Sequence, residues 1–316
     1  MGKVVVTGPT GAIGRALINE AIEDGQEVLA IVHRASVRAD ELSEIAGCRV
    51  LRADLDEYDH ALELMKEQQV DGKGFDMFFH LAWRAPFGDD RDNLNIQLNN
   101  VQASLAAVRL AQKMGCHTFI GAGSQAEYGR TEGVLSPDTP THPETGYGIS
   151  KLCAGQMTRL LCEQIGLRHI WTRILSVYGP HDRKETLIST AVIDMLKDKE
   201  TFFTPCDQVW DYIYSKDAAR AVYIAGKRGK DKAVYIIGSG EGRKLAEYIR
   251  VIARLTGYTK EIGFGKRPYN DKQVMYLKAD ISDLKSDTGF ESEVRFEEGA
   301  KRLVEYYKKQ GYGRGK

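Results

Sequence analysis

Tyr147 and Lys151, one helical turn apart, form the pattern in this sequence with the clearest capacity for chemistry. Side chains at positions i and i+4 lie on the same face of a helix. A phenol has an ordinary pKa near 10, and a neighbouring ammonium group lowers that pKa by stabilising the phenolate. Ser124 ends an apolar run, which places its hydroxyl in the crevice where open α/β sheets bind ligands. The three residues together predict general acid/base chemistry, with Tyr147 as the acid.

A glycine-rich turn near the N-terminus, Thr7 to Gly14, predicts a dinucleotide-binding site. Gly8 allows a tight turn, Gly11 lets the backbone approach a pyrophosphate, and Gly14 lets the next helix lie close to the sheet. An apolar strand pattern precedes the turn and a helical pattern follows it, so the N-terminus of that helix faces the phosphates. We expect cofactor contacts from the following residues of this turn: Gly8, Thr10, Gly11, Ala12, Ile13 and Gly14.

The residues after the second strand bear on which dinucleotide binds. An acidic residue there would bind the ribose 2′-hydroxyl of NAD, whereas a basic residue accommodates the 2′-phosphate of NADP. The sequence has His33 and Arg34 at this place, and a guanidinium can form a forked bond with a phosphate. NADP(H) is therefore favoured, with NAD(H) as the alternative. Asp54 and Leu55, after the third strand, are expected beside the adenine.

Short apolar runs alternate with helical patterns through the first half of the chain. Strands are expected at Lys3–Thr7, Glu27–Val32, Arg49–Ala53, Met77–Leu81, Thr118–Ala122 and Ile170–Ile174, and helices at Arg15–Asp24, His60–Gln69, Leu98–Met114 and Tyr147–Ile165. Nearly all-apolar strands separated by helices indicate a parallel sheet covered on both faces. The fold class is therefore α/β, a doubly wound parallel sheet of the Rossmann type.

The regular alternation ends after about Val177, which indicates a smaller C-terminal lobe. We expect residues 1–175 to form the NAD(P)-binding domain, with elements of 212–238 returning to its sheet. Residues 176–211 and 239–316 would form the substrate lobe, including a short strand near Thr201–Thr204. The charge-rich run Asp89–Asp92 is expected to be a solvated loop.

Over nearly its whole length the chain resembles the extended short-chain dehydrogenase/reductase family of nucleotide-sugar epimerases, dehydratases and reductases. The motifs that carry the resemblance are Thr7–Gly14, Asp54-Leu55, His80-Leu81-Ala82, Asn100-Val101, Ser124–Gly129, Tyr147–Lys151, Arg173–Pro180, Asp211–Ile213, Gly238–Glu241 and Arg267-Pro268. The resemblance implies that Ser124 orients the sugar oxygen, Tyr147 is the general acid/base, and Lys151 holds the nicotinamide ribose. It also implies that Asn100 supports the proton path, that Leu81 and Ala82 contact the cofactor, and that Arg267 contacts the substrate diphosphate.

Departures from the family pattern bear on which reaction the chain catalyses and how it holds the substrate. Gln125 and Ala126 stand where dehydratases have Asp-Glu, which argues against a 4,6-dehydratase. Trp210 replaces an arginine before Asp211, which removes one phosphate contact that the resemblance implies, and Ser176 replaces an asparagine, so the family's pose of the sugar nucleotide is not carried over. Trp83, Gln125, Ser176 and Arg267 are the expected substrate-binding residues.

Three functions follow as hypotheses. The first is a reductase that uses NAD(P)H on the C4 ketone of a nucleotide-diphospho-4-keto-6-deoxy-sugar, with Tyr147 as general acid. The second is an NAD-dependent nucleotide-sugar 4-epimerase that uses the same residues. The third is an NADP-sensing regulatory protein without catalysis, which predicts loss of the Ser, Tyr and Lys set.

Composition excludes other classes of protein. The 316 residues carry 44 Lys+Arg and 44 Asp+Glu, a formal net charge of zero, which argues against nucleic acid or an anionic membrane as partner. No apolar run approaches the length of about 20 residues that a membrane span needs. Five scattered cysteines indicate reduced thiols in a cytoplasmic protein, and no histidine has metal-like spacing, so no metal is expected. By family resemblance, Leu98–Met114 and Tyr147–Ile165 would pair in a homodimer.

Overall fold

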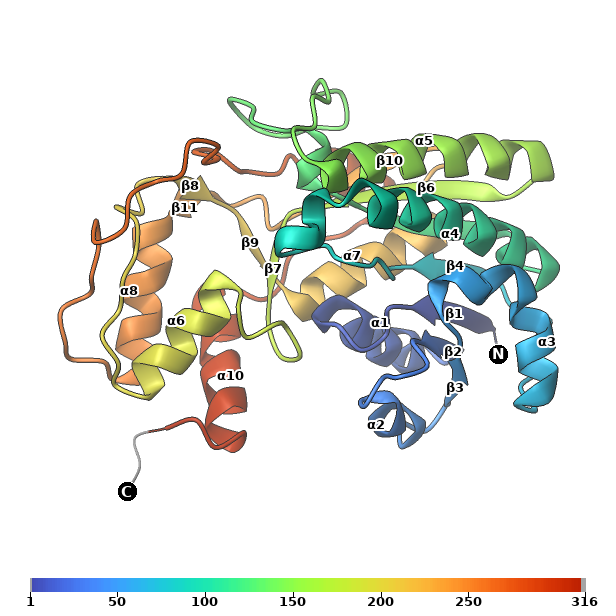
Figure 1. Ribbon diagram of the computed structural model, residues 1–316, viewed down its shortest axis with the longest axis horizontal. Coiled ribbons are helices and arrows are strands. Elements are labelled where there is room, and N and C mark those ends of the chain that lie inside the picture. The colour runs from blue at the N-terminus through green and yellow to red at the C-terminus, as the bar shows by residue number, and fades with distance from the viewer. Residues whose placement is uncertain (1, 314–316) are drawn as a thin grey trace.

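A seven-stranded sheet forms the larger part of the molecule (Figure 1), in the order β10-β6-β5-β4-β1-β2-β3. The computed structural model describes residues 2–313, so the last three residues of the expected substrate lobe lie outside it. All pairs in this sheet are parallel. Its strands are β1 (Lys3–Thr7), β2 (Glu27–Val32), β3 (Cys48–Arg52), β4 (Met77–His80), β5 (Thr118–Ser124), β6 (Arg168–Ile174) and β10 (Val234–Ile237). The doubly wound α/β fold predicted from the sequence is confirmed.

Helices cover both faces of the sheet because its strands are apolar on both sides. Val4 and Val6 of β1 pack with α1 (Ala12–Glu23) and α7 (Ser215–Arg228), in one buried cluster. Val5, between them, belongs to a second cluster with α3 (Ala61–Glu67), α4 (Leu94–Lys113) and α5 (Gly146–Ile165). Successive side chains of a strand point to opposite faces, which is why one strand serves two cores.

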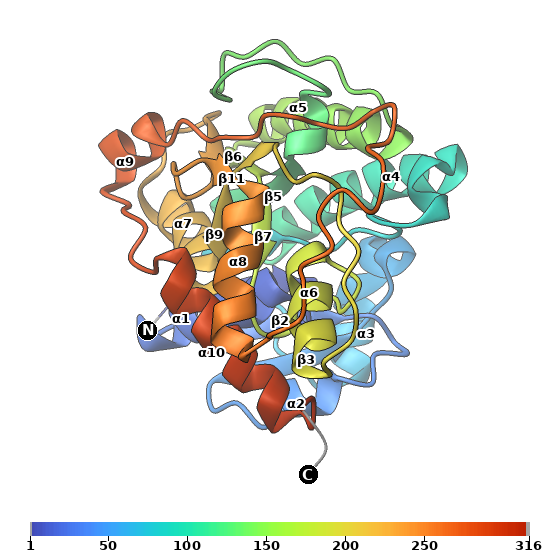
Figure 2. The same cartoon turned by 90° about the vertical axis from the view of Figure 1, so that its left-hand side faces the viewer.

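The smaller part lies at the carboxyl ends of the strands and has its own core (Figure 2). Three helices surround that core: α6 (Leu187–Leu196), α8 (Leu245–Thr256) and α10 (Phe296–Lys309). Tyr178, Tyr248 and Phe296 meet in its centre, with the Tyr248 and Phe296 ring centroids 4.5 Å apart. The remaining elements are α2 (Ala39–Ser43), α9 (Ser282–Thr288), β7 (Ser176–Tyr178), β8 (Val209–Trp210), β9 (Tyr212–Tyr214), β11 (Arg243–Lys244) and the short turns η1 (Leu55–His60), η2 (Asp89–Asp92) and η3 (Gln125–Glu127).

The expected strand at Thr201–Thr204 is wrong, because the segment forms no strand. Phe203 accepts a bond from Arg267 N and donates one to Gly263 O, and these separate bonds do not continue into a ladder. Within residues 2–313, no helix is both long enough and apolar enough to cross a membrane.

The strand order positions the site. β1 lies between β2 and β4, so the chain moves outward in opposite directions from β1. Ligands of open α/β sheets bind at such a reversal, beyond the carboxyl ends of the strands. Thr7, His80 and Ser124 end β1, β4 and β5, and therefore lie along this one edge.

Candidate active site

The glycine turn has the shape that a dinucleotide requires. Gly8 has φ +67°, and a Cβ there would lie 2.9 Å from Ala82 N. A Cβ at Gly14 would collide with the Gly8 carbonyl oxygen, whereas one at Gly11 would meet no atom closer than 3.9 Å. Gly8 and Gly14 thus allow close backbone packing, and Gly11 leaves space in front of α1, which begins at Ala12. Thr10 and Ile13 flank this opening. The residues present therefore fit a pyrophosphate held at a helix N-terminus.

Thr7 joins the ends of β1 and β4. Its Oγ1 accepts hydrogen bonds from Leu81 N and Ala82 N, both at 3.1 Å. His80 lies 3.0 Å from the same oxygen through Nδ1 and 3.1 Å from Ser104 Oγ through Nε2. Because Ser104 donates to Asn100 O, Nε2 must carry the imidazole proton, and burial lowers the His80 pKa to about 3. His80 is therefore a neutral structural residue that fixes the cofactor-facing turn.

The turn after β2 carries an ion pair that the sequence did not indicate. The Arg34 guanidinium donates from Nε (2.8 Å) and Nη2 (2.6 Å) to the carboxylate of Glu57, whose pKa falls to about 2 because of these bonds. Asp54 accepts from Arg34 N at 2.9 Å and lies 3.3 Å from His33 Nε2. Leu55 begins η1 directly behind this cluster. Arg34 lies after β2 as expected, but its guanidinium is already paired with the Glu57 carboxylate. Glu57 follows Asp54 by three residues, the spacing of an N-terminal capping box, which predicts its bond to Asp54 but not its pairing with Arg34.

Ser124, Tyr147 and Lys151 are brought together at the end of β5. Thr145 caps α5 by accepting from Gly148 N at 3.0 Å, which places Tyr147 in the first turn of the helix. The Ser124 hydroxyl lowers the pKa of the Tyr147 phenol, although burial raises it more. Lys151 donates from Nζ to Ala122 O at 2.6 Å, and burial lowers its pKa to about 7. A phenol, a hydroxyl and an ammonium group thus lie together at the carboxyl end of β5.

Trp83 contacts both Lys151 and Tyr147, and Asn100 holds the backbone next to Trp83. The Trp83 ring lies 3.8 Å from Lys151 Nζ and meets the Tyr147 ring edge-on, at a centroid distance of 6.1 Å. Buried Gln97 accepts from Trp83 Nε1 at 2.8 Å, which fixes the indole. Asn100 accepts from Arg84 N and donates to Arg84 O, both at 2.9 Å. The Asn100 side chain therefore holds the backbone that carries Trp83.

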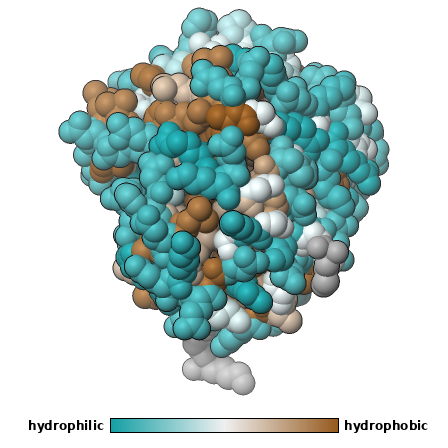
Figure 3. All heavy atoms as spheres, turned by 90° about the vertical axis from the view of Figure 1, so that its right-hand side faces the viewer, coloured by the Kyte–Doolittle hydropathy of each residue, from teal (hydrophilic) through white to brown (hydrophobic). Residues whose placement is uncertain are grey.

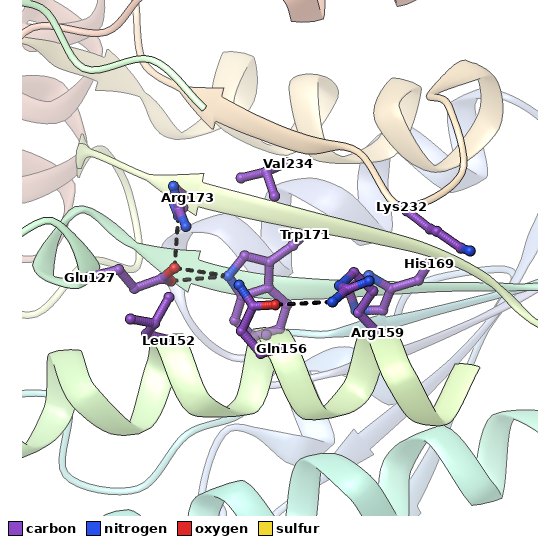
Figure 4. A pocket seen from close by; sticks show the side chains of 10 residues that line it. Glu127, Leu152, Gln156, Arg159, His169, Trp171, Arg173, Lys232 and Val234 are labelled. Atoms are coloured by element: carbon purple, nitrogen blue, oxygen red, sulfur yellow. Dashed lines mark hydrogen bonds and ion pairs between the residues drawn. The ribbon is translucent and has the colours of Figure 1, made fainter. Parts of the chain in front are cut away.

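A buried ion pair lies behind Ser124, beside a cavity of about 300 Å³ between α5, β6 and β10 (Figure 4). Glu127 accepts from Ser124 N at 2.8 Å, from Trp171 Nε1 at 3.0 Å and from Arg173 Nε at 2.8 Å. The Glu127 side chain is 0% exposed and that of Arg173 is 6% exposed. The carboxylate is fully used in holding Ser124 and Arg173 and does not serve as a second acid.

Asp89–Asp92 forms the exposed turn η2, as expected of a solvated loop, but its half-buried Arg91 also makes a contact that was not expected. The Arg91 guanidinium lies over the Tyr147 ring, 4.8 Å from its centroid, and Asp92 accepts from Gly146 N at 2.6 Å. The loop therefore contacts the first turn of α5. A run of charges in the sequence gives no signal for this contact, because Asp92 and Gly146 are 54 residues apart.

The expected substrate residues divide between the two parts of the molecule. Gln125 is half-buried next to Ser124 in η3. Ser176 accepts from Trp210 Nε1 at 2.7 Å, so these two departures from the family pattern contact each other. Arg267 borders a separate cavity of about 270 Å³ in the smaller part, together with Phe202, Phe203, Trp210 and Tyr212. Within residues 2–313, no three His, Cys, Asp or Glu side chains are arranged to hold a metal ion.

Comparison with known proteins adds independent evidence. The NAD dependent epimerase/dehydratase family model matches residues 4–238. The chain is 25% identical over 311 residues to the dTDP-4-dehydro-6-deoxyglucose reductase of Escherichia coli, covering 95% of this chain and 96% of the reductase. It is 25% identical over 276 residues to the UDP-glucose 4-epimerase of Streptomyces lividans, covering 81% of this chain and 82% of the epimerase.

Solved structures share the fold. The UDP-glucose 4-epimerase of Thermotoga maritima, solved with UDP-glucose, superposes with a TM-score of 0.83 and 25% identity, covering 98% of this chain and 99% of that one. The dTDP-glucose 4,6-dehydratase of Bacillus anthracis, solved with NAD, superposes with a TM-score of 0.82 at 19% identity, covering 98% and 97%. The resemblance drawn from the motifs is confirmed: the chain is an enzyme of the NAD-dependent epimerase/dehydratase family, within the extended short-chain dehydrogenase/reductase group.

Proposed function

We propose that this enzyme reduces the C4 ketone of a nucleotide-diphospho-4-keto-6-deoxy-sugar. The observation that carries the proposal is that Ser124, Tyr147 and Lys151 lie together at the edge of the sheet where the glycine turn also lies. A full-length resemblance to a reductase of such a sugar supports the choice of substrate class. The non-catalytic hypothesis predicted loss of these residues, and all three are present.

The residues act by holding and moving one proton. A bound nicotinamide cofactor supplies the hydride that the ketone carbon receives. The Ser124 hydroxyl orients the ketone oxygen, and Tyr147 gives its phenolic proton to that oxygen. Lys151 holds the ribose and stabilises the phenolate, while Ala122 O and the Trp83 ring keep its ammonium group in place. Asn100 keeps Trp83 at the wall of the pocket through its two bonds to Arg84.

For the substrate we propose a pose that spans both parts of the molecule. The sugar would lie against Trp83 and Gln125, and the nucleotide would enter the aromatic cavity of about 270 Å³ with its diphosphate near Arg267. Ser176 would shape the passage between them through its bond to Trp210. Residues 176–211 and 239–316 would thus serve as the nucleotide-sugar lobe, and residues 1–175 as the cofactor domain.

The test is NADPH oxidation by the purified enzyme with dTDP-4-keto-6-deoxyglucose and its UDP, GDP and CDP counterparts. A product reduced at C4 should form at a rate matching NADPH loss. Tyr147→Phe should lower kcat by about 10²–10⁴-fold, because only the acid is removed. Ser286→Ala, a change on the surface helix α9, is the matched loss of a hydroxyl and should leave the rate unchanged. Absence of both NADPH and NADH oxidation with all four sugars would refute the reductase.

One observation favours a second function, an NAD-dependent nucleotide-sugar 4-epimerase. Arg34 is already paired with Glu57, so a 2′-phosphate must displace a carboxylate to reach it, whereas the 2′-hydroxyl of NAD need not. An epimerase also shows full-length similarity in structure. Mass spectrometry of the purified enzyme separates the two: retained NAD with interconversion of C4 epimers supports the epimerase, and exchangeable NADPH supports the reductase.

We also propose a homodimer formed through α4 and α5. Leu94 and Leu98 of α4 and Ile149, Met157 and Leu160 of α5 are exposed, although α4 and α5 pack against each other. Figure 3 looks at the right-hand side of Figure 1. Apolar surface gathers in its upper part, which is the height at which α4 and α5 lie in Figure 1. Exposed apolar patches of this kind mark association surfaces. Light scattering should give the mass of a dimer, and Leu160→Glu should give a monomer. A monomeric native enzyme would refute the interface.

A further inference from the structure

Arg91 lies over the proposed acid without an ionic partner of its own. Its guanidinium carbon is 4.8 Å from the centre of the Tyr147 ring, closer than Lys151 Nζ at 5.9 Å. Arg91 Nε is buried and has no hydrogen-bond partner in the part of the chain that is described. Arg91 also pairs with no carboxylate among residues 2–313, although Asp89, Asp90 and Asp92 are its neighbours in sequence. A half-buried cation that leaves nearby acids unpaired and faces a ring invites a functional explanation.

The loop that carries Arg91 is held where it meets α5 and α4, and also at Ala85, before Arg91. Asp92 accepts from Gly146 N at 2.6 Å, and Asn93 caps α4 by accepting from Ile96 N at 3.3 Å. The approach to α5 is so close that a Cβ at Gly146 would lie 3.3 Å from Asp92 Cα. Fully buried Gln97 donates to Ala85 O at 3.1 Å, behind the loop. The backbone that carries Arg91 is therefore held against the first turn of α5, beside Tyr147.

The other charges around Tyr147 leave this role open. On α5, the Lys151 ammonium group is already engaged by Ala122 O and the Trp83 ring. From η3, the carboxylate of Glu127 opposes ionisation of Tyr147, and from β5 the Ser124 hydroxyl favours it. Trp83 contributes only an uncharged ring edge. Arg91 is thus the cation nearest to the Tyr147 ring that has no other partner.

We propose that Arg91 is a positioning residue for Tyr147, which holds the phenol ring by a cation–π contact and stabilises the phenolate left after proton donation. This inference rests on the proposed function of Tyr147 as the acid. When Tyr147 gives its proton to the ketone oxygen, its O–H bond breaks and negative charge remains on the ring until a proton returns. A guanidinium over the ring face lowers the energy of that state. Asp92 acts as the clamp that keeps Arg91 in register with α5.

The test measures the ionisation of Tyr147 directly, apart from turnover. Tyr147 is replaced by 3,5-difluorotyrosine, whose fluorines bring the phenol pKa into an accessible range, and its ¹⁹F signal is titrated. Arg91→Met should raise that pKa by about one unit or more. Arg91→Lys, which keeps the charge, should restore part of the shift, and Asp92→Ala should give a smaller rise. Arg84→Met is the matched control, since Arg84 belongs to the same loop but pairs with Asp56 at 2.9 Å, and it should leave the pKa unchanged.

Unchanged titration in Arg91→Met, or an equal shift in Arg84→Met, overturns the inference. If Arg91→Met does not fold, the charge-removing variant Arg91→Gln decides instead: a raised pKa of the Tyr147 phenol supports the role of the charge, and an unchanged pKa overturns it. In the proposed reaction, Arg91→Met should lower kcat more than it raises KM, with partial rescue by Arg91→Lys. Lack of turnover in the native enzyme refutes the proposed function, while the ¹⁹F titration still judges Arg91.

Discussion

Two arginine–glutamate pairs have the same chemistry, but one is exposed to water and the other is buried. Arg34 and Glu57, beyond β2, have side chains 48% and 31% exposed, at 2.6 Å. Arg173 and Glu127, behind Ser124, are 6% and 0% exposed, at 2.8 Å. Water screens the first pair, so a ligand can compete for its arginine at little cost. The second pair is enclosed, and loss of one partner would leave a buried charge uncompensated.

The difference separates adjustable parts of the site from fixed ones. The exposed pair lies after β2, where we expect the 2′-position of the cofactor ribose, and opening or closing it would alter cofactor preference without change to the fold. The buried pair holds Ser124 N through Glu127 Oε1, so the position of the Ser124 hydroxyl depends on it. Figure 4 shows this side of the comparison, with Arg173 and Trp171 both directed at Glu127.

The largest expected effect comes from breaking the buried pair. Glu127→Ala should lower the free energy of unfolding by about 3–5 kcal/mol, because Arg173 keeps its charge without a partner. Urea denaturation measures this change. The double variant Glu127→Leu with Arg173→Met should recover most of the stability, since it removes both charges together. A loss below about 1 kcal/mol in Glu127→Ala would show that the pair is not isolated from water as we describe.

Lys151 provides a second buried charge whose effect depends on pH. Burial lowers its pKa in the folded protein to about 7, below the ordinary value of 10.5. Below pH 7 both states bind the proton; between pH 7 and about 10 only the unfolded state does, so this residue makes stability rise with pH by a few kcal/mol. Lys151→Met should remove that rise. Denaturation midpoints of both proteins at pH 6, 8 and 9.5 give the measurement, and parallel curves would contradict the lowered pKa.

The exposed pair should act on the cofactor and not on the fold. If NADP(H) is the cofactor, Arg34→Ala should weaken NADPH binding by about tenfold or more and leave NADH binding unchanged, since a charge-assisted bond to the 2′-phosphate is lost. Glu57→Gln should strengthen NADPH binding by freeing the guanidinium. Calorimetric titration with both cofactors reads the ratio. An unchanged ratio in Arg34→Ala would assign the enzyme to NAD.

The smallest effect completes the comparison. Glu57→Ala, the counterpart of Glu127→Ala, should lower the free energy of unfolding by only about 1 kcal/mol, because an exposed pair in water gains little and the other bond lost is the cap from Asp54 N. The ionic part of this loss should vanish in 0.5 M salt, where surface charges are screened. A loss comparable to that of Glu127→Ala would abolish the distinction between the two pairs.

Local patterns predicted the elements well where the chain repeats a simple period. The strand Lys3–Thr7 is found as expected, and the helix expected at Tyr147–Ile165 begins one residue earlier, at Gly146. The helix expected from Leu98 begins at Leu94, where Asn93 caps it. The strand expected at Thr201–Thr204 failed because no neighbouring strand pairs with it. Period and composition describe a segment, and they do not reveal its partner.

The sequence by itself determined the doubly wound sheet, the glycine turn and the helical spacing of Tyr147 and Lys151. These depend on residues close together along the chain: alternating burial, backbone freedom at glycine, and side chains one turn apart. Only the tertiary structure decided that Glu57 pairs with Arg34, that Glu127 and Arg173 support Ser124, and that Arg91 lies over Tyr147. Each of these contacts involves a charged residue and a partner from another part of the fold. A charged residue looks the same in the sequence whether water or another side chain surrounds it.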